Sequence, residues 1–399
     1  MATDNQSLRG FIEDLERALP AEVLRIKDPV NQNFEMTSTI MELDRLNKSP
    51  VVIFENVAGF DMPVVTNTAA NRGLLARCLN TSVKELPSVF RERCQNYIPP
   101  EIVPRGAWDE IVLEGDDIDL TKLPIPLQFS VDAAPYITAG QVTARDPETG
   151  IDTTGFHRLM LKGKNRLGIS LHSRRRMFEF HRRAEARGEN LPAAIVLGVH
   201  PLHYMGSMVY AYPPNVRKFD IIGGLFGEPY RLARCGIADL EVPANAEIII
   251  EGEILANVHE PEGPFGEFTG YASYRSTQNV FVVKRIRMQR KAYFHSITAG
   301  MARDHILISC ITREGEILNA LRRNIPNVKE VHVPHTTCGA FLAIVSIKKV
   351  SEGEAKMAML STLGTELYKK SVIVVDDDVN IFDMDAVMWA VATRSRAEK

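Results

Sequence analysis

Short runs of β-branched and apolar residues fill the middle of the chain and limit most strongly what it can fold into. They occur at residues 136–143, 158–162, 194–199, 246–254 and 280–288. Turn-forming residues separate most of these runs, and one helical stretch, 176–187, interrupts them. The pattern predicts a β-rich middle domain, with a barrel as the simplest arrangement.

Helices and strands alternate on both sides of this β-rich part. Before it, residues 7–19 and 34–46 have apolar residues at helical spacing, and residues 51–54 form an apolar run typical of a strand. After it, helices and strands are expected at residues 317–322, 328–333, 341–348, 354–363 and 372–375. This alternation is typical of α/β units.

The boundaries between these parts follow from composition. Residues 98–126 are rich in proline and acidic residues, so they are expected to form a linker or a surface arm. We therefore expect an α/β domain at residues 1–115, a β domain at 116–303 and a second α/β domain at 304–399.

The composition argues against a nucleic-acid or membrane partner. The net charge of -3 leaves no basic footprint for nucleic acid, and no apolar run is long enough to span a bilayer. The five cysteines are scattered, without a CxxC pair or zinc spacing. Together these features favour a cytoplasmic protein with reduced thiols.

Two carboxylates flank a break in the β-rich part. Glu262 and Glu267 are separated by Gly-Pro-Phe-Gly. A straight strand would send them to opposite faces, but this insert bends the chain, so both can turn toward one site. Two neighbouring carboxylates resist ionising together, so one tends to keep a proton near neutral pH. The segment predicts a proton-transfer site, with a solvent-facing acidic loop as the alternative.

Basic residues nearby could complete such a site. Arg158 begins a β run and can present its guanidinium fork to a carboxylate. Residues 163–176 combine glycines, hydroxyls and arginines before a helix, a pattern that suits an anion such as phosphate. A basic helix start that faces solvent is the alternative. His172, in this segment, is the one histidine in a setting that invites ligation.

Several segments in order resemble the UbiD-type decarboxylases, which use prenylated FMN, a flavin that carries an extra ring. They are residues 135–140, 146–150, 163–167, 242–247, 262–271, 338–339, 375–378 and 388–394. The resemblance implies an N-terminal α/β domain, a central split β-barrel like that of flavin reductases, and a C-terminal α/β domain. It also implies a homo-oligomer, and a flavin prenyltransferase that supplies the cofactor.

The resemblance assigns roles to individual residues. Arg158, Glu262 and Glu267 match the catalytic Glu–Arg–Glu network of the family, and Glu267 matches the acid that protonates the carbon losing CO2. Lys370 matches a lysine that contacts the cofactor phosphate. The implied activity is non-oxidative decarboxylation, which can be reversible, of an aromatic or α,β-unsaturated carboxylic acid.

The metal site of the family is altered in this chain. Family members bind Mn²⁺, with K⁺ nearby, against the flavin phosphate through Asn, His and Glu. His172 fits the histidine position, but Thr153 and Arg231 stand at the other two. Arginine cannot ligate a cation, because its guanidinium stays protonated. The resemblance thus implies a cofactor-binding set of Thr153, Arg158, His172, Arg231 and Lys370. The chain also ends five residues after Arg394, where family members continue into a segment that helps subunits associate.

Three functions remain open at this point. The first is a decarboxylase that uses prenylated FMN, with Glu267 as proton donor. The second is an enzyme of the same fold that works without this cofactor on an anionic substrate, with Arg231 in place of a metal ligand. The third is a non-catalytic subunit of a hetero-oligomeric carboxylase.

Overall fold

The structure of the chain is a computed structural model that describes residues 5–171 and 176–395. It divides into two compact units, each built from two stretches of sequence. Residues 1–71 and 93–305 form the first unit, and residues 72–92 and 306–399 form the second. Residues 72–92 thus fall in the same unit as the C-terminal part of the chain.

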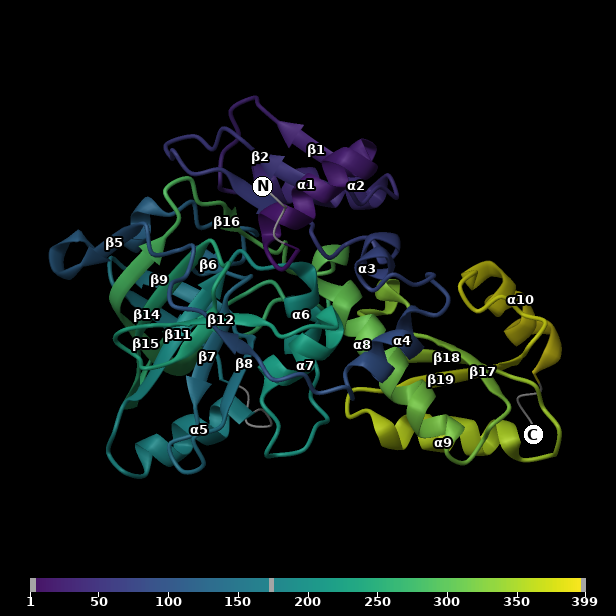
Figure 1. The fold of residues 1–399 in the computed structure, drawn as a ribbon. Helices are drawn as coiled ribbons and strands as arrows, with labels where there is room; N and C mark the ends of the chain where they lie inside the picture. The colour runs from purple at the N-terminus through teal and green to yellow at the C-terminus, as the bar shows by residue number, and fades with distance from the viewer. Residues whose placement is uncertain (1–4, 172–175, 396–399) are drawn as a thin grey trace. The chain divides into compact units, whose positions relative to one another are not determined.

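A nine-stranded antiparallel sheet dominates the first unit and curls into a half-barrel (Figure 1). The strand order is β6-β9-β10-β15-β14-β11-β7-β8, and β5 pairs with β15. The strands are β5 (Ile111–Glu114), β6 (Tyr136–Ile137), β7 (Gln141–Arg145), β8 (Asp152–Phe156), β9 (Leu159–Gly163), β10 (Arg166–Ile169), β11 (Leu191–Leu197), β14 (Ile248–Glu262) and β15 (Ser276–Met288). The expected β-rich middle of the chain is therefore confirmed as one curled sheet.

The core of this sheet explains its apolar runs. Strand β11 is buried at all but one position, so its sequence is almost continuously apolar instead of alternating. Helix α5 (Arg176–Glu185) contributes Met177, Phe180 and Ala184 to the same core. These three residues recur at helical spacing, which is why the helix was visible in the sequence.

Among its described residues, the first unit also contains two smaller sheets and four more α-helices. One sheet has the order β1-β2-β3-β16, and the other has the order β13-β12-β4. Their strands are β1 (Val23–Ile26), β2 (Val51–Phe54), β3 (Val64–Thr66), β16 (Phe294–His295), β4 (Glu101–Ile102), β12 (Arg231–Arg234) and β13 (Glu241–Pro243). The helices are α1 (Leu8–Ala18), α2 (Glu35–Arg45), α6 (Pro201–Ser207) and α7 (Lys218–Phe226). Ser7 caps α1 by accepting a hydrogen bond from the N–H of Gly10.

The second unit contains a three-stranded sheet with the order β17-β18-β19. Its elements are α3 (Arg72–Cys78), α4 (Leu86–Arg93), the long helix α8 (Arg303–Arg322), β17 (Val328–His332), β18 (Leu342–Ile347), α9 (Glu354–Thr365), β19 (Ser371–Asp376) and α10 (Met384–Arg394). Strands β18 and β19 are parallel, and β17 is antiparallel to β18.

Most segments expected from the sequence are present, with different lengths. Helix α8 is 20 residues long, whereas apolar spacing predicted only residues 317–322 near its end. The expected linker at 98–126 instead contributes β4 and β5, and β5 pairs with β15 of the large sheet. Its alternating exposure, which leaves half the strand in water, explains why this segment looked like a surface arm.

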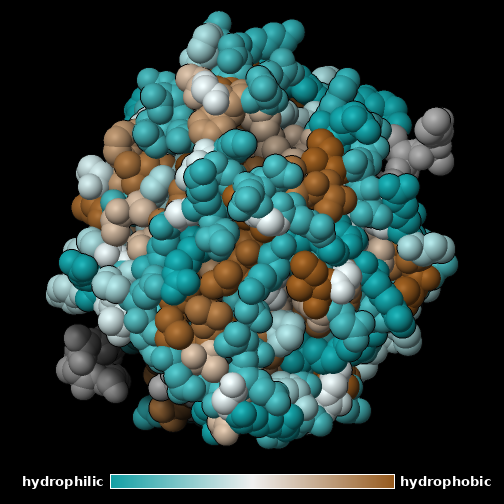
Figure 2. Space-filling model, turned by 90° about the vertical axis from the view of Figure 1, so that its left-hand side faces the viewer, coloured by the Kyte–Doolittle hydropathy of each residue, from teal (hydrophilic) through white to brown (hydrophobic). Residues whose placement is uncertain are grey.

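Among the described residues, no helix combines the length and the apolar character needed to cross a membrane. The face drawn in Figure 2 is mainly hydrophilic, with hydrophobic residues in separate groups between the polar ones.

Candidate functional site

The segment after β14 folds back on itself and brings two carboxylates together. Strand β14 ends at Glu262, and Gly263 follows with a φ of 80°, a backbone conformation that favours glycine. The N–H of Glu267 then donates to the carbonyl of Tyr271, which closes a tight turn. Asp132 secures this loop by accepting a hydrogen bond from the N–H of Gly266 at 2.8 Å. Glu262 and Glu267 thus face one site, as the sequence predicted.

Arg158 joins the two carboxylates. It lies between β8 and β9, and its Nε and Nη2 donate to the two carboxylate oxygens of Glu262 at 2.9 and 2.7 Å. Its Nη1 donates to Oε1 of Glu267. One guanidinium therefore binds Glu262 through two parallel hydrogen bonds and keeps its third nitrogen for Glu267.

The two carboxylates differ in exposure, which separates what they can do. The Glu262 side chain is fully buried, whereas 27% of the Glu267 side chain is exposed. Burial lowers the pKa of Arg158, but the hydrogen bonds and charges of the two glutamates outweigh it and raise that pKa above its ordinary value. Arg158 is thus a permanent cation between an inaccessible carboxylate and an accessible one.

Two aromatic residues lie next to the group formed by Arg158, Glu262 and Glu267. The guanidinium carbon of Arg158 lies 5.1 Å from the centre of the Phe265 ring, and that ring lies 4.6 Å from the ring of Tyr136. The buried hydroxyl of Tyr136 has no well-formed hydrogen bond among the described residues. Burial, followed by the nearby charge of Glu262, raises its pKa, so Tyr136 stays protonated. The sequence analysis did not select Tyr136, because a tyrosine at a strand start resembles any core residue.

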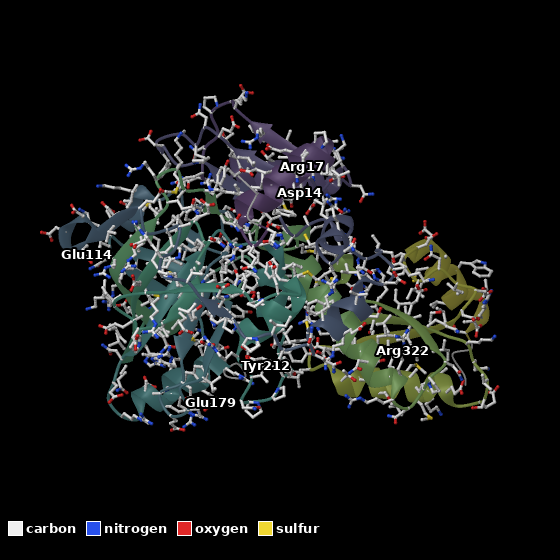
Figure 3. The ribbon with its side chains drawn as sticks, viewed as in Figure 1. Asp14, Arg17, Glu114, Glu179, Tyr212 and Arg322 are labelled. Carbon is white, nitrogen blue, oxygen red and sulfur yellow. The ribbon has the colours of Figure 1, made fainter. Side chains whose placement is uncertain are left out.

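A pocket lies beside β8 in the same unit. Its lining residues are Thr153, Thr154, Gly155, His157, Arg176, Met177, Val209, Tyr210, Tyr212 and Lys218. Figure 3 marks Tyr212, which lies on the loop between α6 and α7. The lining includes two cations and hydroxyl donors, and none of these residues is a carboxylate.

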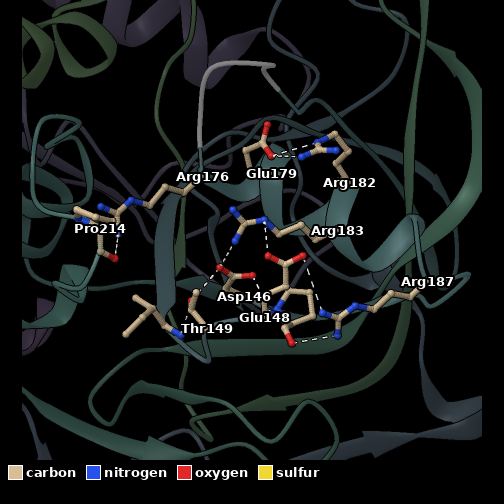
Figure 4. Close-up of polar contacts among 11 residues, drawn as sticks. Asp146, Glu148, Thr149, Arg176, Glu179, Arg182, Arg183, Arg187 and Pro214 are labelled. Atoms are coloured by element: carbon tan, nitrogen blue, oxygen red, sulfur yellow. Dashed lines mark hydrogen bonds and ion pairs between the residues drawn. The ribbon is translucent and has the colours of Figure 1, made fainter.

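The turn before β8 is fixed by its own polar contacts (Figure 4). Asp146 accepts hydrogen bonds from the hydroxyl of Thr149 and the N–H of Glu148, and it pairs with Arg183 of α5. The acidic side chain after the turn, Asp152, pairs with Arg217. These contacts hold the start of β8, and with it Thr153, against α5 and α7.

The residues selected from the sequence are brought together only in part. Thr153 lines the pocket, and Arg158 follows the pocket residue His157 directly in the chain. Arg231 lies on β12, where its backbone N–H and Nε both donate to Oε1 of Gln6, and it is not among the lining residues.

Two further residues of the predicted set are placed separately. Lys370 belongs to the second unit, with its Nζ 4.5 Å from the centre of the Phe341 ring. His172 lies outside the described residues. Within residues 5–171 and 176–395, no three histidine, cysteine or acidic side chains are grouped so that they could hold a metal ion.

The pocket contains residues that sequence reasoning missed. Lys218 opens the apolar helix α7, and only 7% of it is exposed. A lysine directly before the mainly apolar stretch Phe-Asp-Ile-Ile-Gly-Gly was the available signal. Tyr212 also lines the pocket.

Models of one protein family match nearly the whole chain. The N-terminal, Rift-related and C-terminal domains of 3-octaprenyl-4-hydroxybenzoate carboxy-lyase (UbiD) match residues 12–94, 102–302 and 306–399. Among curated proteins, the anhydromevalonate phosphate decarboxylase of Methanothermobacter thermautotrophicus is 32% identical over 392 residues, which covers 98% of this chain and 89% of the relative.

Solved structures give the same similarity. An evolved dimeric form of the UbiD-class enzyme HmfF from Pelotomaculum thermopropionicum, in complex with prFMN, is 36% identical, with a TM-score of 0.94 over 98% of this chain and 91% of that one. The apo 3,4-dihydroxybenzoic acid decarboxylase AroY from Klebsiella pneumoniae is 27% identical, with a TM-score of 0.91 over 98% of this chain and 86% of that one.

Proposed function

The chain belongs to the UbiD family of carboxy-lyases, and from this premise we propose that it decarboxylates an aromatic or α,β-unsaturated carboxylic acid with prenylated FMN as cofactor. The observation that carries the proposal is that Arg158 donates hydrogen bonds to both Glu262 and Glu267. Loss of CO2 leaves an electron pair on the carbon that carried the carboxylate, and that carbon needs a proton.

Glu267 is the residue that delivers this proton. Its side chain is the accessible one of the pair, and Arg158 fixes its direction. Glu262 is buried and both of its oxygens bind Arg158, so its role is to hold the guanidinium and balance its charge.

The cofactor supplies the step that the side chains cannot. When bound, prenylated FMN provides an electron-poor centre that accepts electron density from the substrate. The pocket beside β8 fits the phosphate of a flavin, because Lys218, Arg176 and the hydroxyls of Thr153 and Tyr212 line it. A flavin prenyltransferase would supply the cofactor. The described residues do not fit a divalent cation, since two cationic side chains and no carboxylate line this pocket.

The relatives narrow the substrate class. The curated relative is named for a phosphorylated carboxylic acid, and the AroY relative for an aromatic one. Both names describe acids that lose CO2. We therefore keep an unsaturated or aromatic acid as the substrate, and the same pocket chemistry would also suit a phosphate carried by the substrate.

The two other functions are weaker. A non-catalytic subunit would have no need of Arg158, Glu262 and Glu267 in one hydrogen-bonded group. An enzyme without flavin rested on Arg231 as an anion ligand, but Arg231 donates to Gln6 and does not line the pocket. Lys218, which lines the pocket, replaces Arg231 as the candidate ligand for an anion.

The proposal is tested by Glu267→Gln in enzyme loaded with prenylated FMN. Loss of the acidic proton should lower the rate of CO2 release by about 100-fold or more, since general acids contribute at least this much. Glu260→Gln is the matched control, because Glu260 lies two residues before Glu262 on β14 and pairs with Arg166. An unchanged circular dichroism spectrum would show that the fold is kept. Full CO2 release by Glu267→Gln would remove Glu267 from the mechanism.

A further inference from the structure

We propose that Asp132 is a positioning residue for the proton transfer, and that its carboxylate fixes the direction in which Glu267 presents its acid. The inference deepens the proposed function and rests on it for the role of Glu267. Asp132 ends a turn of residues 129–132, shortly before β6, and only 9% of it is exposed. It acts on Glu267 through the backbone of the preceding residue, Gly266.

Both carboxylate oxygens of Asp132 accept hydrogen bonds from the backbone. Oδ1 accepts from the N–H of Gly266 at 2.8 Å, and Oδ2 accepts from the N–H of Phe129 at 3.0 Å. Because both partners are donors, the two oxygens must both be acceptors, as they are in an ionised carboxylate. An amide of the same shape would turn its NH2 group toward one of the two N–H groups. One side chain therefore closes its own turn and ties that turn to the loop that carries Glu267.

Two further contacts align the 129–132 turn with this loop. The N–H of Ala133 donates to the carbonyl of Pro264 at 2.9 Å. The ring of Phe129 packs so closely on Gly266, and also on Gly300, that neither glycine has room for a side-chain carbon. The turn thus meets the loop at three points, directly before its catalytic glutamate.

The 129–132 turn is itself fixed to the first unit. Gln128, which precedes it, is 3% exposed. Its Nε2 donates to the carbonyl of Ile297 at 2.9 Å, and its Oε1 accepts from the N–H of Ala299 at 2.6 Å. These bonds attach the turn to the segment that follows β16. Asp132 therefore links the Glu267 loop to a part of the unit that is held on its other side as well.

The charge of Asp132 also belongs to the surroundings of the site. Burial raises the pKa of Asp132, whereas its hydrogen bonds from backbone N–H groups and the nearby charge of Arg158 lower it. A mostly buried carboxylate costs free energy unless such partners offset it. Arg158 binds the Glu267 carboxylate, and Asp132 holds the backbone one residue before it. The direction of the acid is thus set from both of its ends.

The test compares Asp132→Asn with wild type, both loaded with prenylated FMN. The value of kcat for CO2 release should fall by about tenfold or more with KM unchanged, because a small misplacement of a catalytic group slows the reaction without weakening substrate binding. Asp304→Asn is the matched control, since Asp304 is also buried and its oxygens accept from the N–H groups of Ala69 and Asn67 at 3.0 and 2.9 Å. Both variants should melt at a lower temperature than wild type, but only Asp132→Asn should lose kcat.

A double variant separates positioning from a general loss of structure. Asp132→Asn combined with Glu267→Gln should be no slower than Glu267→Gln alone, because Asp132 acts through Glu267, whereas independent effects would multiply. Phe129→Leu removes the ring that packs on Gly266 and keeps the carboxylate of Asp132. It should therefore also lower kcat at unchanged KM, and it tests the proposal if Asp132→Asn does not fold.

Amide hydrogen exchange of the full chain without cofactor provides a readout that needs no activity. Residues 263–271 should exchange faster in Asp132→Asn than in wild type and Asp304→Asn, since a loop that loses its attachment opens more often. If wild type released no CO2, the proposed function would fail, and this exchange would still decide whether Asp132 holds the loop. Unchanged exchange, a kcat for Asp132→Asn within about twofold of wild type, or multiplied losses in the double variant would overturn the proposal.

Discussion

At the scale of single residues, the site depends on the shape of one guanidinium. Arg158 makes two parallel hydrogen bonds to a buried carboxylate and a third contact to an exposed one. A lysine carries the same charge as a point on a flexible chain, so it cannot bind Glu262 through two bonds and hold Glu267 as well. The geometry of the fork, more than its charge, should therefore set the direction in which Glu267 offers its proton.

Arg158→Lys should accordingly lower kcat for CO2 release by about 100-fold, the scale seen when one positioned donor is removed from an active site. Arg166→Lys is the control, since Arg166 binds Glu260 with Nε at 2.8 Å and lies on the neighbouring strand β10. Steady-state kinetics of both variants, loaded with cofactor, provide the comparison. A rate for Arg158→Lys within a few-fold of wild type would mean that charge alone suffices.

The sequence could identify these residues but not their unequal surroundings. The break between Glu262 and Glu267 predicted that both turn to one site, and they do. Glu262 is 0% exposed, and Arg158, which binds its carboxylate, lies 104 positions away in the chain. No spacing within residues 262–267 contains that information. Lys218 escaped notice for the same reason, because its pocket is built from four separate segments.

At the scale of elements, the loop between β14 and β15 sets the distance between the two glutamates. Gly266 packs directly on the ring of Phe129, and a side-chain carbon there would lie 2.4 Å from that ring. Its N–H donates to Asp132. The pKa of that carboxyl is raised by burial, although the hydrogen bonds it accepts from backbone N–H groups, including that of Gly266, oppose the rise. Close contact with Phe129 thus holds the loop in place at Gly266, a position where only glycine fits.

Gly266→Ala should therefore displace Glu267 and lower kcat, by about tenfold or more, because a small misplacement of a catalytic group is costly. The free energy of unfolding should also fall by about 1–3 kcal/mol, as for other overpacked sites. Gly364→Ala in α9 is the control, since nothing lies within 4 Å of its added carbon. Equal kcat values for Gly266→Ala and wild type would show that the loop tolerates the shift.

At the scale of the whole molecule, buried histidines make the fold sensitive to acid. Burial lowers the pKa of His200, His203 and His295 to about 3 each, so they are neutral in the folded chain. In the unfolded chain they bind protons below about pH 6.5. Their contribution to stability is therefore complete above about pH 6.5 and is lost as the pH falls toward 3.

Each of these histidines should lower the free energy of unfolding by about 1.4 kcal/mol per pH unit in that range. His295→Gln tests one of them, because glutamine can still reach the hydroxyls of Tyr204 and Thr68 that His295 binds. Urea unfolding between pH 7 and 5 should show a shallower pH dependence for His295→Gln than for wild type. His259→Gln, at an exposed position of β14, should leave it unchanged, and parallel curves for His295→Gln and wild type would contradict this account.

The central claim is that Glu267, steadied by Arg158, moves a proton to and from the reacting carbon. Exchange of the product's own hydrogen with D2O measures this transfer directly, since it needs no CO2. Enzyme loaded with cofactor should place one deuterium on the carbon that carried the carboxylate, Glu260→Gln should do the same, and Glu267→Gln should exchange about 100-fold more slowly. Exchange by Glu267→Gln at the wild-type rate would contradict the account.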